Sequence, residues 1–428
     1  MRIKLLATLL AAAFASSAVM GANLSEIYQL AKANDAEFSA AQASYQAGLE
    51  KLPQGKALLR PNINLFGNLR ENDNDSVASS YGSHQYGVTL SQPLYRKQNL
   101  ESYEQAKLQV LQAEQSLKVA EQSLQLRVAQ TYFAVLQAQD VLATAQSQKQ
   151  AFGEQLAQAR KSFEVGVVTI TDTHEAQARF DLTGAQEIAA RNDLEVKRRA
   201  LEKIINSESP ELARLSEGAA LSLPQPNNMD AWVKQAEADS LAVALGHTAQ
   251  EAARREVDKQ KGGHHPTLDF AANYGSSRNA SSPGSSGKSG YIGVEFVMPL
   301  YQGGATDSRI REAIALQNRS RHDLENARRQ ARLDARQGFL GVLSGEAQAK
   351  ALEQALVSSE AQLRSTKLGL EVGVRTRVDV LNSQQQLYTT RRDLAAARYQ
   401  TLLAGLQLKA AAGILNEEDL KAIDALLK

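Results

Sequence analysis

Side chains that commonly do chemistry are sparse in this sequence, and their surroundings favour structural roles. The chain has no cysteine, which excludes a thiol nucleophile, a disulfide framework and a cysteine-based zinc site. His264 and His265 precede Pro266 at an expected helix–strand junction, which is typical of a polar interface position rather than of a metal-ligand set. Residues 283–289 resemble a phosphate-binding loop, but Ser282 replaces its first glycine and no helix follows. We therefore expect no enzyme, no metal and no cofactor.

Two short segments have the residue types of a sharp turn between helices. Residues 165–172 read Val-Gly-Val-Val-Thr-Ile-Thr-Asp, and residues 372–381 read Val-Gly-Val-Arg-Thr-Arg-Val-Asp-Val-Leu. Glycine permits a left-handed turn, so each Val-Gly-Val predicts the end of one helix and the start of another. Asp172 and Asp379 follow the two turns at equivalent places. Arg375 lies about one helical turn before Asp379, so it is near enough to pair with Asp172 across two helix hairpins.

The turns belong to a unit that occurs twice in the chain. The Pro-Leu-Tyr at 93–95 recurs at 299–301, at nearly the same separation as the two turn motifs. We assign the first structural repeat to 23–206 and the second to 229–428. The stretch 207–228 contains three prolines and is predicted to link them.

Each repeat predicts one β-hairpin and one long helix hairpin. Apolar and polar side chains alternate within about 62–92 and 267–298, as in strands with one apolar and one polar face. The proline-free stretches 99–165 and 306–372 predict helices of roughly 100 Å, whose small and apolar residues recur at coiled-coil spacing. Shorter helices are expected at about 24–59, 170–206, 229–261 and 376–412.

The N-terminus predicts export. Arg2 and Lys4 precede an apolar run at 5–15 and small residues up to Ala22, the pattern of a signal peptide over 1–22. No later segment approaches ~20 consecutive apolar residues, so no transmembrane helix is expected in the mature chain. The 48 basic and 47 acidic residues nearly cancel, and no charge excess favours nucleic acid as a partner.

The amphipathic strands bear on whether the β-sheet closes into a barrel. If their apolar face meets lipid, the sheet must close into a barrel, because unpaired strand edges are very costly in hydrocarbon. Four strands are too few, so several chains would share one barrel: two chains give eight strands and three give twelve. The alternative is a soluble sheet whose apolar face covers a core.

On these motifs the mature chain resembles the TolC family of outer membrane efflux channels. The two turn motifs, Ile27-Tyr28-Gln29, Pro-Leu-Tyr at 93–95 and Pro-Leu-Tyr-Gln-Gly-Gly at 299–304 support the resemblance, as does the duplication. It implies a mainly α fold with a β-hairpin region. Three identical chains would form a twelve-stranded transmembrane β-barrel, surrounded by outer membrane lipid, and a long coiled-coil α-helical barrel in the periplasm of a Gram-negative bacterium.

The resemblance also implies a function and partners. The homotrimer would be the passive exit duct of a tripartite efflux pump or a type I secretion system, conducting drugs or secreted protein. Its partners would be a periplasmic adaptor (membrane fusion) protein and an inner-membrane transporter of the RND, ABC or MFS type. A structural or adhesive coiled-coil surface protein is the alternative, although such a protein has no use for two turned-back tips. Nothing in the sequence identifies the cargo.

The resemblance assigns roles to residues at the turns. A link that holds the periplasmic entrance shut would involve Asp172, with Thr171 beside it, and Arg375. Three copies of Asp379 around one axis would form a cation-attracting ring. A solvated ion pair worth ~0–1 kcal/mol is the alternative for Arg375 and Asp172. Residues implied to touch the adaptor are Val165, Gly166, Val167, Val372, Gly373 and Val374.

Two positions depart from the family pattern. Asn382 stands where some members have a second constriction aspartate, so we expect a less acidic ring. Leu370 stands where a tyrosine helps to close the entrance in other members, which puts that contact in doubt.

Overall fold

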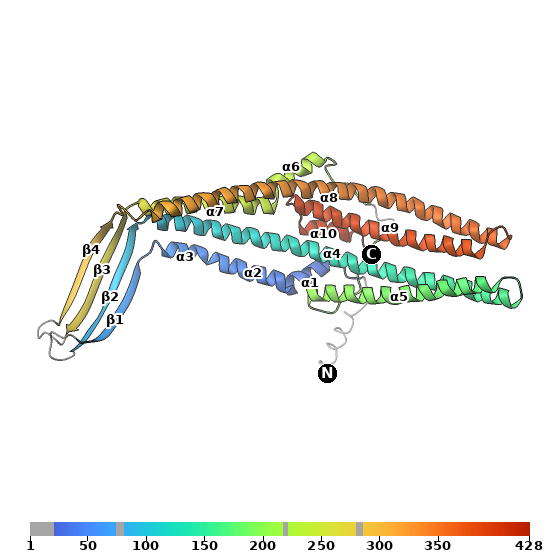
Figure 1. Ribbon diagram of the computed structural model, residues 1–428, viewed down its shortest axis with the longest axis horizontal. Coiled ribbons are helices and arrows are strands. Elements are labelled where there is room, and N and C mark those ends of the chain that lie inside the picture. Colours follow the sequence, from blue (N-terminus) through green and yellow to red (C-terminus); the bar gives the residue numbers. More distant parts are fainter. Residues whose placement is uncertain (1–20, 74–80, 217–220, 280–285) are drawn as a thin grey trace, which may run out of the picture. The chain divides into compact units, whose positions relative to one another are not determined.

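The computed structural model describes residues 21–73, 81–216, 221–279 and 286–428 (Figure 1). The expected signal peptide at 1–22 therefore lies almost wholly outside the described residues, and so does the first part of the loop-like segment 283–289.

The chain forms two compact units, each built from both halves of the sequence. The first unit comprises Met1–Ala40, Val119–Ser240 and Gln330–Lys428. The second comprises Ala41–Lys118 and Leu241–Arg329. The two predicted long helices are confirmed as α4 (Lys97–Glu164, 68 residues) and α8 (Ala305–Glu371, 67 residues), and each contributes residues to both units.

The second unit contains a four-stranded antiparallel sheet in the order β1-β2-β3-β4. Its strands are β1 (Asn62–Asn72), β2 (Tyr81–Tyr95), β3 (Thr267–Asn279) and β4 (Gly287–Val297). Both predicted hairpins are confirmed, but the strands reach further into the expected polar loops. The reason is pairing: Asn72 lies opposite Tyr81, and Ser277 opposite Gly287, so polar residues at the strand ends still join the ladder.

The register gathers the apolar side chains on one face of the sheet. Leu65 lies opposite Val88, and Val88 lies opposite Tyr274 in the next strand. Leu65 is 82% exposed and Ile292 is 78% exposed. The core of this single chain therefore does not cover the apolar face, as a soluble sheet would require.

The remaining helices of the second unit pack along the first part of α4 and of α8. They are α2 (Ala36–Leu49, which begins in the first unit), α3 (Lys51–Ala57), α7 (Leu241–Lys261) and the short η1 (Gly262–His264). Where β2 leads into α4, the guanidinium of Arg96 donates to both carboxylate oxygens of the buried Asp269 on β3, at 2.8 and 2.6 Å. Such a bidentate ion pair fixes direction as well as distance, so it orients the sheet on its helix.

The first unit contains α1 (Leu24–Asn34), α5 (Ile170–Ile205), α6 (Met229–Asp239), α9 (Arg377–Ala411) and α10 (Glu417–Asp424). Figure 1 shows α5 returning beside α4, and α9 returning beside α8. Ion pairs join each hairpin: Lys149 with Glu187 between α4 and α5 at 2.7 Å, and Arg398 with Glu353 between α9 and α8 at 2.7 Å.

Two expected single helices are divided. The helix expected at 24–59 is α1, α2 and α3. Asp35 separates α1 from α2, because it takes an extended backbone and its carboxylate accepts the N–H of Phe38 in the first turn of α2. Glu50 lies between α2 and α3. The helix expected at 229–261 is α6 and α7, separated by Ser240. The sequence did not indicate α10.

The core of the first unit is built around α1. Leu24, Ile27 and Tyr28 are fully buried, and Lys32 forms ion pairs with Glu121 of α4 at 2.7 Å and Glu417 of α10 at 2.8 Å. One lysine thus ties α1 to two helices that lie far apart in the sequence.

The described residues of the predicted linker at 207–228 pack within the first unit. Leu212 pairs with Ala22, and Leu215 pairs with Leu427 close to the C-terminus. Tyr132 of α4 donates its hydroxyl hydrogen to the carbonyl of Ala213 at 2.8 Å. These contacts give the segment a defined path.

None of the described helices is both long and apolar enough to cross a membrane.

Gly413 provides a test of the packing between α9, α10 and α6. Its φ is +72°, and a Cβ there would overlap the carbonyl oxygen of Asp239. We expect Gly413→Ala to lower the free energy of unfolding by ~2 kcal/mol or more, since a left-handed backbone and a steric clash add. Thermal melting followed by circular dichroism measures the change. Gly405→Ala is the control, because a Cβ at Gly405 meets no atom within 4 Å and should be tolerated. Equal melting of both variants would contradict the packing described.

Candidate functional site

The first candidate site is the turn that joins α4 to α5. Gly166 has a φ of +75°. Its N–H donates to the carbonyl of Phe163 at 2.9 Å, and the N–H of Val167 donates to that of Ser162 at 2.8 Å. These two bonds form the Schellman motif, which satisfies carbonyls at the end of a helix and reverses the chain.

The turn from α8 to α9 repeats this geometry. Gly373 has a φ of +81°, its N–H donates to Leu370 at 3.1 Å, and the N–H of Val374 donates to Gly369 at 2.8 Å. Both predicted turns are therefore confirmed, and the left-handed backbone explains why each contains glycine.

Each new helix starts with a reciprocal cap. The hydroxyl oxygen of Thr169 accepts the N–H of Asp172 at 3.3 Å, and the carboxylate of Asp172 accepts the N–H of Thr169 at 3.0 Å. In α9 the corresponding distances for Thr376 and Asp379 are 3.2 and 2.9 Å. The predicted equivalence of Asp172 and Asp379 thus extends to a capping role that sequence reasoning missed, although Thr-x-x-Asp after each turn is a visible signal for it.

The cap has an electrostatic consequence for Asp379. The backbone N–H and the hydroxyl of Thr376 donate to its carboxylate and hold its pKa below the ordinary value of 3.8. A carboxyl with a lowered pKa stabilises the fold above its ordinary pKa, and that stabilisation disappears only as pH falls through the lowered value. Asp379 is therefore negatively charged throughout the neutral and mildly acidic range.

Both turns present apolar side chains to solvent. The exposed fractions are 73% for Val165 and 74% for Val167, and 66% for Val372 and 75% for Val374. Together with Gly166 and Gly373 they form two small apolar surfaces, which we call the turn surfaces. Exposed apolar groups at defined positions favour contact with another protein.

Polar contacts join α9 to the α4–α5 hairpin. Arg377, next to the α9 cap, donates to the hydroxyl of Ser162 on α4 at 2.9 Å. Arg179 of α5 donates to the side-chain oxygen of Asn382 at 3.1 Å. Asn382, which sequence reasoning treated as a missing aspartate, therefore has a structural partner.

Further contacts continue along α9. Gln148 of α4 donates to Gln385 at 2.5 Å, and Tyr388 donates to the carbonyl of Ser147 at 3.2 Å. Sequence reasoning missed all these partners, because a polar residue on a coiled coil gives no signal of the helix that it will face.

A more buried contact lies further along α9. Tyr399 donates to the carboxylate of Asp140 on α4 at 2.7 Å, and its ring stacks on Phe133 with centroids 5.8 Å apart. Burial raises the pKa of the Asp140 carboxyl, while the hydroxyl of Tyr399 favours the charged form. The contacts of α9 thus change from neutral and cationic polar pairs near the turn to a half-buried carboxylate with a buried tyrosine farther away.

The other predicted site residues lie around the second turn and its counterpart. Thr171 is exposed in the first turn of α5, and Leu370 is half-buried in the last turn of α8. The N–H of Arg375 donates to Gly369 at 3.0 Å. Among the described residues of the single chain, no ion pair joins Arg375 to Asp172, so that link stays a prediction for the assembled protein.

The two histidines have ordinary polar partners. His264 lies 3.1 Å from a carboxylate oxygen of Asp307, and His265 lies 3.3 Å from the hydroxyl of Tyr95. In the described part of the chain, no group of three or more potential ligands is placed to hold a metal ion.

Comparison with known proteins places this geometry in context. The family model described as outer membrane efflux protein matches residues 27–207 and 232–414. The chain is 35% identical to outer membrane protein TolC of Vibrio cholerae serotype O1, covering 96% of this chain and 95% of that protein. It is 30% identical to the alkaline protease secretion protein AprF of Pseudomonas aeruginosa, covering 93% of this chain and 86% of AprF.

Solved structures share the fold. The outer membrane protein VceC of Vibrio cholerae matches with a TM-score of 0.78 at 16% identity, covering 91% of this chain and 96% of VceC. The open state of the MtrE outer membrane channel of Neisseria gonorrhoeae matches with a TM-score of 0.76 at 17% identity, covering 93% of this chain and 91% of MtrE.

The capping box of α9 can be tested by removing its hydroxyl. We expect Thr376→Val to accelerate amide exchange in residues 376–380 about fivefold, because losing such a cap costs about 1 kcal/mol. Hydrogen exchange followed by mass spectrometry measures this. Thr169→Val should act only on residues 169–173, so each variant is the control for the other. Unchanged exchange at both sites would show that the caps do not hold the turns.

Proposed function

Because the chain belongs to the outer membrane efflux protein family, we propose that its two helical turns form the gated periplasmic entrance of an outer membrane exit duct. The protein is an outer membrane channel of efflux or type I secretion, and the family is one of transport channels rather than of enzymes. Relatives named for protease secretion and for efflux both occur, so either class of cargo suits the family.

We propose that three chains assemble. The sheet of one chain has four strands, its edge strands β1 and β4 each pair with one neighbour, and β4 is exposed along its whole length. Three sheets joined edge to edge would supply twelve strands and direct the apolar face to lipid. Exposed apolar residues on the helices, such as Ile188 of α5 and Val357 of α8, suit contacts between subunits.

The observation that carries the gate proposal is the matched pair of turns with polar contacts beside them. Arg377 with Ser162, and Arg179 with Asn382, join α9 to the other hairpin through exposed or half-buried groups. Such bonds contribute little each, so the α8–α9 hairpin would separate from α4–α5 without unfolding. In the trimer, Arg375 would add a link to Asp172, and the charged Asp379 would favour cations.

The turn surfaces suit a protein partner. A periplasmic adaptor could cover the exposed valines and connect the duct to an inner-membrane transporter, which would supply the energy that a passive channel lacks. The repeated geometry gives each chain two similar docking sites. Because each turn surface is small, we expect each contact with the adaptor to be of moderate strength. The contacts at the several turns of the assembled protein would then add to the overall affinity.

Removal of the Arg375 guanidinium tests the gate. We expect Arg375→Ala to raise single-channel conductance in planar lipid bilayers severalfold while the protein still assembles, because the link that closes the entrance is lost. Arg392→Ala is the matched control, since Arg392 lies on α9, the helix that follows the turn of Arg375, and pairs with its neighbour Asp393. An unaltered closed pore in Arg375→Ala would refute the role of Arg375.

Introducing a charge on a turn surface tests whether the adaptor docks there. We expect Val374→Asp to weaken capture of the adaptor at least tenfold, because a contact that buries valine is worth about 1.5–3 kcal/mol and the carboxylate must also be desolvated. Val374→Ile keeps the surface apolar and should bind normally. Co-purification of adaptor with each variant measures the difference, and equal capture by both would remove the valines from the docking site.

A further inference from the structure

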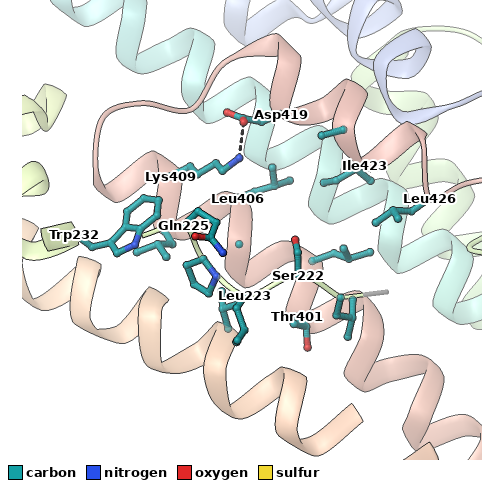
Figure 2. Close-up of a pocket in the computed structure, with 17 residues that line it drawn as sticks. Ser222, Leu223, Gln225, Trp232, Thr401, Leu406, Lys409, Asp419, Ile423 and Leu426 are labelled. Atoms are coloured by element: carbon teal, nitrogen blue, oxygen red, sulfur yellow. Dashed lines mark hydrogen bonds and ion pairs between the residues drawn. The ribbon is translucent and has the colours of Figure 1, made fainter. Parts of the chain in front are cut away.

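A cavity of about 260 Å³ lies within the first unit, away from both turns (Figure 2). Its walls come from α6, α8, α9, α10 and the segment 221–225. Figure 2 shows Trp232 on one side, Ile423 and Leu426 on the other, and Leu406 between them.

The walls of the cavity are held in place by the core. Trp232 is 4% exposed, and its indole N–H donates to the carbonyl of Pro226 at 2.8 Å. It packs in one cluster with Phe339, Leu408 and Ala412. Because these side chains are fixed by other contacts, the cavity is preformed, as ligand pockets usually are.

Two glycines near the cavity differ in whether helix packing explains them. Gly338 on α8 faces Leu408, where a Cβ would lie 3.0 Å from a backbone atom, so packing explains that glycine. Gly405 lines the cavity, and a Cβ there would meet nothing within 4 Å. A glycine inside a helix costs about 1 kcal/mol relative to alanine. No packing contact offsets that cost, so helix packing does not explain this glycine.

The polar groups of the cavity favour an uncharged ligand. Lys409 and Asp419 form an ion pair at 2.6 Å and neutralise each other, and the second oxygen of Asp419 accepts the N–H of Asn416 at 2.9 Å. Of the acidic residues in the first turn of α10, Asp419 lines the cavity, while Glu417 is paired with Lys32 at 2.8 Å. An anion would therefore meet no cation in the cavity that is not already paired. The ammonium of Lys409 has three N–H groups and shares one with Asp419, so it can donate to a ligand oxygen.

We propose that this cavity binds an uncharged amphiphile, of which a medium-chain aliphatic alcohol is the simplest form. Its hydroxyl oxygen accepts a hydrogen bond from Lys409, and its chain lies against Trp232, Leu406 and Ile423. The residues that line the cavity do not include those of either turn, so the proposal does not depend on the gate described above.

The chain offers its own reporter, because Trp232 is the sole tryptophan. Purified protein in tryptophan-free liposomes is titrated with 8-bromooctan-1-ol, whose bromine quenches indole fluorescence on contact. We expect saturable quenching. Gly405→Leu, which fills the cavity, should weaken binding at least tenfold, whereas Gly405→Ala leaves most of the space and should bind nearly as the unchanged protein does. Both substitutions favour the helix, so their difference reports on volume.

The preference for an uncharged headgroup is tested with 8-bromooctanoate in the same liposomes. We expect it to bind at least tenfold more weakly than the alcohol, because its carboxylate would enter an apolar cavity whose lysine is already neutralised by Asp419. Non-saturable quenching that is equal in all three proteins would mean that the probe reaches Trp232 only through lipid, or that a neighbouring subunit fills the cavity, and would overturn the proposal. Equal affinity for the carboxylate would overturn the assignment of an uncharged ligand.

Discussion

A single α-helix of 68 residues has no interior in which to bury its apolar side chains, and the rest of the structure follows from that constraint. α4 and α8 each need another helix along their length, and the chain supplies it by turning back. Gly166 and Gly373 permit the reversal, and the caps at Thr169 and Thr376 start the returning helices. The stability of the long hairpins therefore depends on two five-residue turns, which makes the turns both structural and exposed.

We infer from the same constraint where the two hairpins of the proposed gate would separate. Apolar seams and ion pairs such as Arg398 with Glu353 stabilise each hairpin internally. Near the turns, the hairpins contact each other through polar groups such as Arg377 and Ser162, while the half-buried Asp140 and Tyr399 lie farther along α9. A difference in the kind of contact along one interface favours separation at the turns and resistance farther away. This gradient is what a gate at the turns needs.

The sequence predicts the elements whose signal is long or repeated. The proline-free stretches give α4 and α8 to within two residues, and strict alternation gives both β-hairpins. Prediction from the sequence fails where a tertiary contact determines the end of a helix. Asp35 ends α1 partly because Arg127 of α4 binds its carboxylate at 2.7 Å, which no local pattern reveals. The turns were found through their glycines, whereas the partners of Asn382 and Arg377 depend on how two helices are rotated against each other.

The central claim is that the α8–α9 hairpin must separate from α4–α5 for cargo to pass. The chain has no cysteine, so Ser162→Cys with Arg377→Cys places two unique thiols across that contact. These thiols can be joined by a bifunctional maleimide with a reducible spacer, and cargo export is then measured before and after reduction, with each single-cysteine variant as a control. We expect that the joined protein does not export and that reduction restores transport. Full export by the joined protein would contradict the central claim.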